Sequence, residues 1–297
     1  LKRTWAQINL DAIQHNYEAI KASLSDGCRV MAVVKADAYG HGAGFVSRTL
    51  RDAGVSWFGV SNLDEALQIR DEGIAEPILI LAYTPPGQAE QLAANNITQT
   101  VFERSYAEQL SQAAVKAGVT VRVHIKLDTG MSRIGFFCQG EQGIIDTVDE
   151  VERVCGLPGL YPEGIFTHFA SADEKKDDEY TLRQFERFLR VTEGLTSRGI
   201  KLSIRHCCNS AATMRFPDMH LDMVRPGIIL YGLVPSPWMD GILPLQPAME
   251  LKTVVSMTKT VPDGTSVSYG RTFNSKHDTT IDPSCVVICP IRFHASF

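Results

Sequence analysis

Eight short apolar runs, most of them followed by an amphipathic stretch, limit how this chain can fold more than any other feature. Strands that alternate with helices form a parallel sheet, because each helix returns the chain to the same edge of the sheet. The count of eight favours closure of that sheet into a (β/α)8 barrel. We therefore predict an α/β fold in which residues 1–234 form this barrel. The predicted strands are residues 30–36, 57–61, 77–82, 97–102, 121–127, 164–168, 202–207 and 221–225, and the predicted helices include residues 43–53, 63–72, 106–117 and 180–197.

An open, doubly wound sheet is the alternative fold for the same pattern. Its dinucleotide-binding form has a Gly-x-Gly-x-x-Gly sequence directly after the first strand, and this chain has none there. Before the first predicted barrel strand, residues 5–10 alternate like a short strand and residues 11–24 have a helical apolar face. Asn9 or Asp11 is the expected cap of that helix.

The alternating pattern ends at residues 235–238, Pro-Ser-Pro-Trp, which predicts a domain boundary near Val234. Beyond it, residues 249–261, 267–272 and 285–288 have the composition of β segments separated by turns. We therefore expect residues 235–297 to form a partial, mostly β domain.

Composition limits the partners and the compartment. The net charge of −5 gives no reason to expect nucleic acid or a membrane surface as a partner, and no apolar run approaches the roughly 20 residues that a membrane helix needs. Seven cysteines without framework spacing favour a reducing cytoplasm. Cys207 and Cys208 lie beside His206 inside an apolar run, which is more typical of core residues than of metal ligands, so we assign no metal site.

Polar residues stand at the ends of five predicted strands. In a (β/α)8 barrel these ends meet at one mouth, where the active site lies. Any one of these residues has an ordinary structural explanation, but the convergence of five strand ends is far less expected by chance. The residues are Lys35 after the first strand, Lys126 to Arg133 at the fifth, His168 at the sixth, Asn209 and Ser210 at the seventh, and Arg225 and Gly227 at the eighth.

Lys35 ends an apolar run, and Tyr39 and two glycines follow it closely. A lysine at such a place often simply extends to solvent, but apolar walls can lower its pKa and make its amine a nucleophile toward an aldehyde cofactor. Phosphate sites in this fold favour the loops after strands seven and eight, where Ser210 offers a hydroxyl and Gly227 a backbone N–H. A phosphate site across the mouth from a strand-end lysine predicts a pocket for pyridoxal phosphate.

Residues 32–42, AVVKADAYGHG, resemble the pyridoxal phosphate attachment motif of alanine racemases. Further motifs of that family follow in the same order at residues 126–133, 164–170, 209–210, 224–228 and 267–270, and the similarity covers about residues 1–280. The resemblance implies a pyridoxal 5′-phosphate-dependent racemase that interconverts L- and D-alanine and supplies D-alanine for peptidoglycan. The family's β domain continues past the point where this chain stops, so we expect an incomplete β domain.

The resemblance also implies two catalytic bases. Lys35 would hold the cofactor and act as one base, and Tyr269 of a partner subunit would be the second, so the working unit would be a homodimer. Inversion of a stereocentre requires proton removal from one face and delivery to the other, which needs groups on opposite sides.

By the same resemblance, Arg225 would face the pyridine nitrogen of the cofactor, oriented by His168. A guanidinium can only donate, so the ring would stay unprotonated, a weaker electron sink that limits side reactions such as transamination. Arg133 would contact the substrate carboxylate, positioned by Lys126, a residue that is carbamylated in many relatives. The phosphate would be held by Tyr39, Ser210, Gly227 and Ile228, with Asn209 as a further cofactor-binding residue.

Three alternatives stay open at this point. The chain could be a pyridoxal phosphate-binding barrel without turnover, a serine or broad-specificity racemase, or a barrel decarboxylase of basic amino acids. The retention of Tyr269 favours a racemase over a binding barrel. The segment 126–133 resembles racemases rather than decarboxylases.

Overall fold

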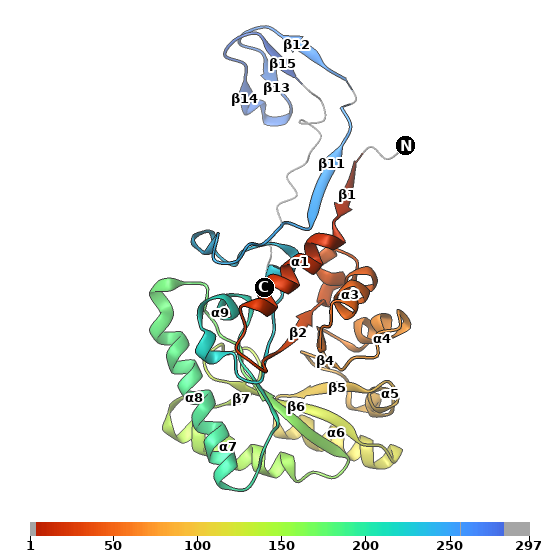
Figure 1. Cartoon of the computed structure of the whole chain (residues 1–297), viewed down its shortest axis with the longest axis vertical. Helices are drawn as coiled ribbons and strands as arrows, with labels where there is room; N and C mark the ends of the chain where they lie inside the picture. Colours follow the sequence, from red (N-terminus) through yellow and green to blue (C-terminus); the bar gives the residue numbers. More distant parts are fainter. Residues whose placement is uncertain (1–3, 256, 282–297) are drawn as a thin grey trace. The chain divides into compact units, whose positions relative to one another are not determined.

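The computed structural model describes residues 4–255 and 257–281 (Figure 1). Contacts gather the chain into two compact units: Asn9–Ala248 form one, and residues 1–8 with 249–297 form the other. Residues 235–248 thus belong with the barrel, beyond the boundary expected near Val234. The reason is local, since the backbone N–H of Ala248 donates to the carbonyl oxygen of Tyr231 over 3.1 Å.

The larger unit is a nearly closed barrel of eight parallel strands, in the order β10-β2-β3-β4-β5-β6-β8-β9. Backbone bonds from Asp222 N to Arg205 O (3.1 Å) and from Arg225 N to Cys208 O (2.9 Å) link the segments of β9 and β10. The predicted (β/α)8 barrel is therefore confirmed. Its strands are β2 (Arg29–Val33), β3 (Trp57–Val60), β4 (Ile78–Ile80), β5 (Ile97–Val101), β6 (Val121–Asp128), β8 (Leu160–Phe166), β9 (Ile204–His206) and β10 (Met223–Val224), and the short β7 (Phe136–Phe137) pairs with β6.

Helices lie outside the strands (Figure 1). The five helices predicted from periodicity are present, each within two residues of its predicted ends, and the side chain of Asn9 caps the first by accepting from Ala12 N. Three further helices, α5, α7 and α9, were not predicted. The helices are α1 (Leu10–Ala22), α3 (Ala43–Asp52), α4 (Leu63–Asp71), α5 (Ala89–Ala94), α6 (Arg104–Ala117), α7 (Gly140–Cys155), α8 (Asp178–Ser197) and α9 (Ser210–Arg215). In the described part of the chain, no helix is both long and apolar enough to cross a lipid bilayer.

Alternate residues of the strands face two different apolar clusters, as the two-residue period of a strand requires. In β2, Val30 and Ala32 belong to the large cluster between strands and helices, whereas Met31 belongs to a second cluster. Since Met31 points to the opposite side of β2, this second cluster occupies the barrel interior. It contains Met31, Trp57, Leu79, Phe166, Ile204 and Met223.

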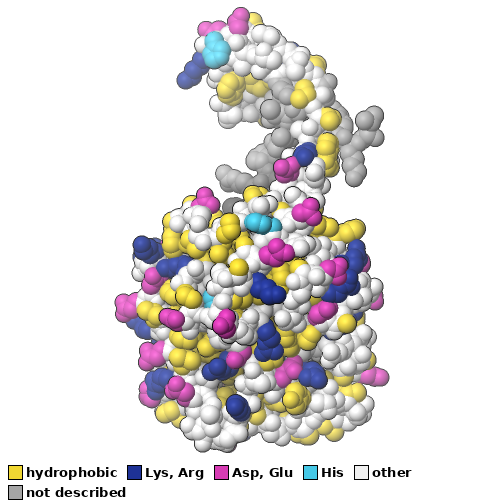
Figure 2. Space-filling view, viewed as in Figure 1, with side chains coloured by type: hydrophobic (Ala, Val, Ile, Leu, Met, Phe, Trp, Pro, Cys, Tyr) yellow, Lys and Arg dark blue, Asp and Glu magenta, His cyan; other side chains and the backbone are white. Residues whose placement is uncertain are grey.

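On the face of the molecule seen in Figure 2, acidic and basic side chains are interspersed, in keeping with the small net charge of −5.

Several predicted strand boundaries were wrong. The first barrel strand ends at Val33 rather than continuing through Lys35, because a left-handed turn begins there. The sixth begins at Leu160 instead of residue 164, since a β-bulge opposite Val123 and His124 accommodates Pro162 within the strand.

The smaller unit is built of two-stranded antiparallel pairs in its described part. β1 (Thr4–Ile8) pairs with β11 (Met249–Thr253), β12 (Lys259–Val261) with β15 (Thr279–Ile281), and β13 (Ser266–Val267) with β14 (Phe273–Asn274). The β character expected here is confirmed, but residues 267–272 are not one strand. Tyr269–Arg271 form a single 3-10 turn, η6, and Ser268 before it has a φ of 63°. The strand expected at residues 285–288 lies outside the described residues.

Asn16 offers a test of how the segment after the barrel is held. Its buried side-chain amide donates to Leu230 O (3.0 Å) and Gln246 O (2.8 Å), and its oxygen accepts from Gln246 N (2.7 Å). Asn16→Ala leaves these three backbone groups unpaired, so we expect the free energy of unfolding to fall by about 2–5 kcal/mol. Urea denaturation measures it. Gln14→Ala, on the exposed face of the same helix, should change stability by less than about 0.5 kcal/mol, and an equal loss in both variants would contradict the assignment.

Candidate active site

Because all eight barrel strands are parallel, their C-terminal ends open at one mouth. Hydrogen bonds and close contacts join the predicted residues there into linked groups, which the following paragraphs describe. Lys35 and Tyr39 follow β2, Lys126 lies in β6 and Arg133 after it, His168 follows β8, Asn209 and Ser210 follow β9, and Arg225, Gly227 and Ile228 follow β10.

The segment after β2 is a turn of left-handed helix, α2 (Lys35–Gly40). Residues 36–39 all have φ between 51° and 54° although none is glycine. Such a conformation costs roughly 1–2 kcal/mol per residue, so it persists only where other contacts fix it. Glu65 accepts a hydrogen bond from Ala36 N (2.9 Å), and Asp37 accepts one from Ala43 N at the start of α3 (2.7 Å).

The Lys35 amine is half-buried at the start of this turn. Burial and the nearby charge of Arg133 lower the pKa of Lys35, while Glu65 opposes the shift. Its Nζ lies 6.0 Å from the centre of the Tyr39 ring. A lysine of lowered pKa spends more time as the neutral, nucleophilic amine.

Tyr39, Ser210 and Gly227 form a small polar cradle, which we call the anion cradle. Gly227 N donates to Ser210 Oγ (2.9 Å), and a Cβ built on Gly227 would lie only 2.8 Å from the Tyr39 hydroxyl oxygen. A side chain at residue 227 would therefore fill the space beside both hydroxyls. Burial raises the pKa of Tyr39 to about 12, so its hydroxyl keeps its proton and can donate.

Asn209 and Ile228 flank the anion cradle. The Asn209 side chain accepts from Ala212 N (3.0 Å) and so caps α9, which fixes the start of the helix at Ser210. Ile228 is half-buried and opens the 3-10 turn η4 (Ile228–Tyr231) directly after Gly227. Both residues therefore position the cradle through the backbone.

Arg225 is only 4% exposed, inside the barrel mouth. Its Nη1 donates to His206 Nδ1 (2.9 Å), and its Nη2 contacts His168 Nδ1 (3.2 Å). The carbonyl oxygens of Thr167 and Cys207 also accept from Nη2, at 2.7 and 3.2 Å. These acceptors satisfy a buried charge that would otherwise be costly. Burial and the Arg225 charge lower the pKa of His168 well below its usual value, so His168 is neutral and able to accept.

Lys126 and Arg133 come from the long segment around the end of β6. The Lys126 amine is buried and donates to Leu127 O (2.9 Å), and burial together with Arg225 lowers its pKa to about 7. Asp128 orders the following loop by accepting from Gly130 N and Ser132 N. Arg133 is exposed, and its guanidinium makes no hydrogen bond or ion pair to any residue within 4–255 or 257–281.

Tyr269 is not among these barrel residues. It belongs to the smaller unit, where its side chain is 99% exposed. Its ring and hydroxyl are therefore open to solvent or to another molecule.

Sequence reasoning missed Tyr231 and the histidines of the barrel interior. The Tyr231 hydroxyl donates to Val33 O (3.0 Å), and its ring lies 5.2 Å from that of Tyr39. Tyr231 thus packs against Tyr39 and helps to hold this member of the anion cradle in place. The available signal was a polar residue within an apolar run, which His206 in residues 202–207 also displays.

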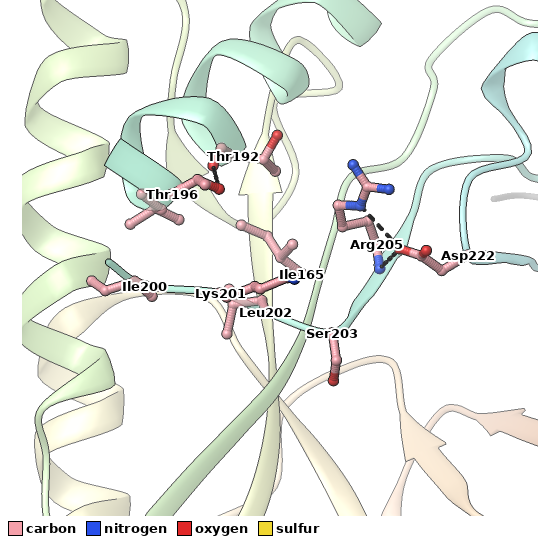
Figure 3. Close-up of a pocket in the computed structure, with 10 residues that line it drawn as sticks. Ile165, Thr192, Thr196, Ile200, Lys201, Leu202, Ser203, Arg205 and Asp222 are labelled. Atoms are coloured by element: carbon pink, nitrogen blue, oxygen red, sulfur yellow. Dashed lines mark hydrogen bonds and ion pairs between the residues drawn. The ribbon is translucent and has the colours of Figure 1, made fainter. Parts of the chain in front are cut away.

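A separate cavity of about 330 Å³ lies at the N-terminal ends of the strands, away from these groups. Figure 3 shows Ile165 and the end of α8 beside the chain that enters β9, with Arg205 and Asp222 paired across 3.0 Å. It shares no residue with the mouth.

A barrel mouth that combines an amine of lowered pKa, an anion cradle and a buried arginine defines a (β/α)8 barrel enzyme for small anionic ligands. Residues 8–235 match the family model described as "Alanine racemase, N-terminal domain". The chain is 47% identical over 278 residues to the alanine racemase of Desulforamulus reducens, covering 93% of this chain and 74% of that protein.

A solved alanine racemase of Clostridium difficile 630 superimposes with a TM-score of 0.86 at 39% identity, covering 95% of this chain and 72% of that one. The chain is also 42% identical to alanine racemase 2 of Caldanaerobacter subterraneus subsp. tengcongensis, over 99% of this chain and 73% of that protein. The chain belongs to the alanine racemase family, and the resemblance seen in its motifs is confirmed.

The left-handed turn beside Lys35 makes an unusual prediction. Ala36 is exposed with φ 51° and ψ 52°, a conformation that glycine adopts without the Cβ penalty. We expect Ala36→Gly to raise the free energy of unfolding by about 0.5–1 kcal/mol. Ala19→Gly, inside the right-handed helix α1, should lower it by a similar amount. Thermal and urea denaturation of the pair measure both changes, and a loss of stability in both would show that the turn is not left-handed in solution.

Proposed function

We propose that this chain interconverts L- and D-alanine with pyridoxal 5′-phosphate held at the barrel mouth. One observation carries the proposal: the Lys35 amine, of lowered pKa, lies 6.0 Å from the ring of Tyr39, whose hydroxyl belongs to the anion cradle. Pyridoxal phosphate carries an aldehyde and a phosphate on neighbouring positions of one ring. An amine and an anion cradle at such close range suit that arrangement.

The anion cradle fits a phosphate group. Ser210 Oγ already accepts from Gly227 N, which leaves its hydroxyl proton free to donate. The protonated Tyr39 hydroxyl is a second donor, and the missing side chain of Gly227 leaves room between them. Phosphate oxygens are strong acceptors, so two hydroxyl donors converging on one space favour this group.

Arg225 fits the pyridine nitrogen. Its Nη atoms are held by His206, His168 and backbone carbonyls, but its Nε–H has no partner in the described part of the chain. A guanidinium has no acceptor, so it can only donate to the ring nitrogen, which therefore stays unprotonated. When bound, the cofactor supplies an electron sink for the electrons left at the substrate Cα.

Two side chains would move the α-proton. Lys35 would remove or deliver it on one face, and Tyr269 of a second subunit on the other, which implies a homodimer. The near-complete exposure of Tyr269 supports this assignment, since a side chain that serves a partner need not pack within its own chain. Arg133, whose guanidinium has no hydrogen bond or ion pair among the described residues, would bind the substrate carboxylate.

We further propose that the product D-alanine supplies peptidoglycan synthesis in the cytoplasm. Cys28, Cys138, Cys155, Cys207 and Cys208 are free thiols, the state that a reducing compartment maintains.

The decisive experiment follows alanine racemisation in both directions with added cofactor. Lys35→Ala should abolish both turnover and the borohydride-stable attachment of cofactor, because Lys35 supplies the amine beside the anion cradle, whereas the Lys126 amine is buried and donates to Leu127 O. Tyr269→Phe should lower turnover by at least about 100-fold while deuterium still enters the enantiomer that Lys35 deprotonates. Tyr161→Phe, an exposed tyrosine of the barrel surface, is the matched control and should be unchanged.

The outcomes separate the alternatives. A folded chain that binds cofactor at Lys35 but exchanges no α-hydrogen would be a binding barrel, and a chain that takes up no cofactor would refute the site. Faster turnover of L-serine than of L-alanine would identify a serine racemase.

The pKa of about 7 at Lys126 predicts a pH-dependent carbamate. Only a neutral amine adds carbon dioxide, and the neutral fraction rises as the pH increases through that value. We expect ¹³C-bicarbonate to give a Lys126 carbamate signal that is strong near pH 8 and weak near pH 6. Lys126→Ala is the control that should remove the signal. Mass spectrometry that finds only unmodified Lys126 under bicarbonate would contradict the modification.

A further inference from the structure

A chain of buried side chains runs from Arg225 into the barrel. Arg225 Nη1 contacts His206 Nδ1 at 2.9 Å, and His206 Nε2 contacts His124 Nδ1 at 2.8 Å. Both imidazoles are fully buried. Beyond them, His124 Nε2 lies 3.8 Å from a carboxylate oxygen of Glu163. The chain therefore has a cation at one end and a carboxylate at the other.

Arg225 fixes the direction of the hydrogen bonds that join it to His206 and His206 to His124. A guanidinium cannot accept, so His206 Nδ1 must be the acceptor and the ring proton of His206 lies on Nε2. That proton is donated to His124 Nδ1, which places the proton of His124 on Nε2. Burial and the Arg225 charge lower the pKa of both histidines, that of His124 to about 3, so each ring is neutral and carries one proton.

The far end of the chain is an unpaired donor that faces Glu163. His124 Nε2 is buried and has no hydrogen-bond partner in the described part of the protein. Glu163 is 8% exposed, and its oxygens accept from Thr98 Oγ1 (2.9 Å) and Arg122 Nη1 (2.9 Å). Glu163 sits at the β-bulge where the pairing of β8 shifts opposite His124. Bulges commonly re-aim a side chain, and this one brings a carboxylate to the end of the chain.

Packing restricts the rotation of both imidazoles. The ring of Phe166 stacks on His206 at 4.7 Å with an angle of 5°, and Trp57 lies 5.2 Å from His124. A Cβ on Gly164 would lie 2.6 Å from the His124 ring, so the ring occupies the space beside this glycine. Packing therefore holds the ring planes, and Arg225 sets the protons.

We propose that His206, His124 and Glu163 are positioning residues that hold the Arg225 guanidinium as a donor toward the pyridine nitrogen of the cofactor. This inference rests on the proposed function. With Nη1 held by His206 and Nη2 by His168 and two carbonyl oxygens, the guanidinium plane is fixed and its Nε–H keeps one direction. Glu163 supplies the negative charge toward which all the N–H groups of the chain point.

The consequence concerns the fidelity of the reaction. Transamination would be the competing outcome: the α-proton would pass to the cofactor instead of returning to Cα, and hydrolysis would release pyruvate with the amino group left on the cofactor. A ring nitrogen that gains a proton from solvent favours this outcome, because the ring becomes a stronger electron sink. A loosened Arg225 should therefore increase pyruvate formation relative to racemisation.

The histidine tautomers of the whole polypeptide, measured with and without cofactor, test the direction of the hydrogen bonds from Arg225 to His206 and His124. With ¹⁵N-labelled histidine, we expect the Nε2–H form at both His206 and His124 and a coupling across their N–H···N bond. A proton on Nδ1 of His206 would overturn the inference. This measurement does not depend on turnover, so failure of the proposed function would leave its result intact.

Glu163→Gln tests the role of the charge. The amide preserves the size of the side chain. The hydrogen bonds between Arg225, His206 and His124 cannot reverse their direction, because a guanidinium cannot accept a hydrogen bond. We expect the ratio of pyruvate formation to racemisation to rise about tenfold and the absorbance band of the bound cofactor to shift. Glu141→Gln, an exposed partner of Arg190, is the matched control and should change neither.

Thr98→Val is a milder variant for the case that Glu163→Gln does not fold. It removes one hydrogen bond to Glu163 but keeps the charge, so the ratio should rise by less. An unchanged ratio in a folded, cofactor-binding Glu163→Gln protein would overturn the inference. If the protein bound no cofactor at all, the proposed function would fail instead. The tautomers of His206 and His124 alone would then decide whether the hydrogen bonds run in the inferred direction.

Discussion

The guanidinium of Arg225 is a permanent positive charge inside the barrel, and the arrangement of the mouth depends on satisfying it. Isolated, such a charge would cost several kcal/mol even after relaxation. Here His168, His206 and the carbonyl oxygens of two strand ends accept its N–H groups. These acceptors come from β9 and from the segments that follow β8 and β9, so one side chain just after β10 ties three neighbouring strands together. Burial, reinforced by this charge, keeps the surrounding histidines neutral and lowers the pKa of Lys126.

On the other side of the mouth, the constraint is a strained backbone rather than a buried charge. Four consecutive residues with left-handed φ follow β2, and carboxylates of Glu65 and Asp37 hold the turn by accepting backbone N–H groups. Because this turn reverses the chain within a few residues, it brings Tyr39 to Gly227 while Lys35 stays at the mouth. A strand that continued through Lys35 would carry Tyr39 away from the anion cradle. The strained turn thus brings the Lys35 amine and the anion cradle close together.

Much of this arrangement could be predicted from the sequence. Apolar runs alternating with amphipathic stretches predicted the barrel, and polar residues at strand ends predicted Lys35, His168, Ser210, Arg225 and Gly227 as neighbours. Periodicity failed where it was weak. Helix α9 is only six residues long, and β8 contains Pro162, which disguised its first half. Glu163 was missed for that reason, since the bulge that places it beside His124 is a property of the pairing between two strands.

The sequence by itself determined which residues stand at the strand ends, because a two-residue period and the order of the elements are local properties. Only the tertiary structure decided how those residues act on one another. The left-handed turn depends on the Glu65 carboxylate, which comes from a different helix, and the hydrogen-bond direction in the barrel depends on His124 and His206, which are 82 residues apart. The pKa shifts of Lys35 and Lys126 likewise arise first from burial, and burial exists only once the barrel has closed.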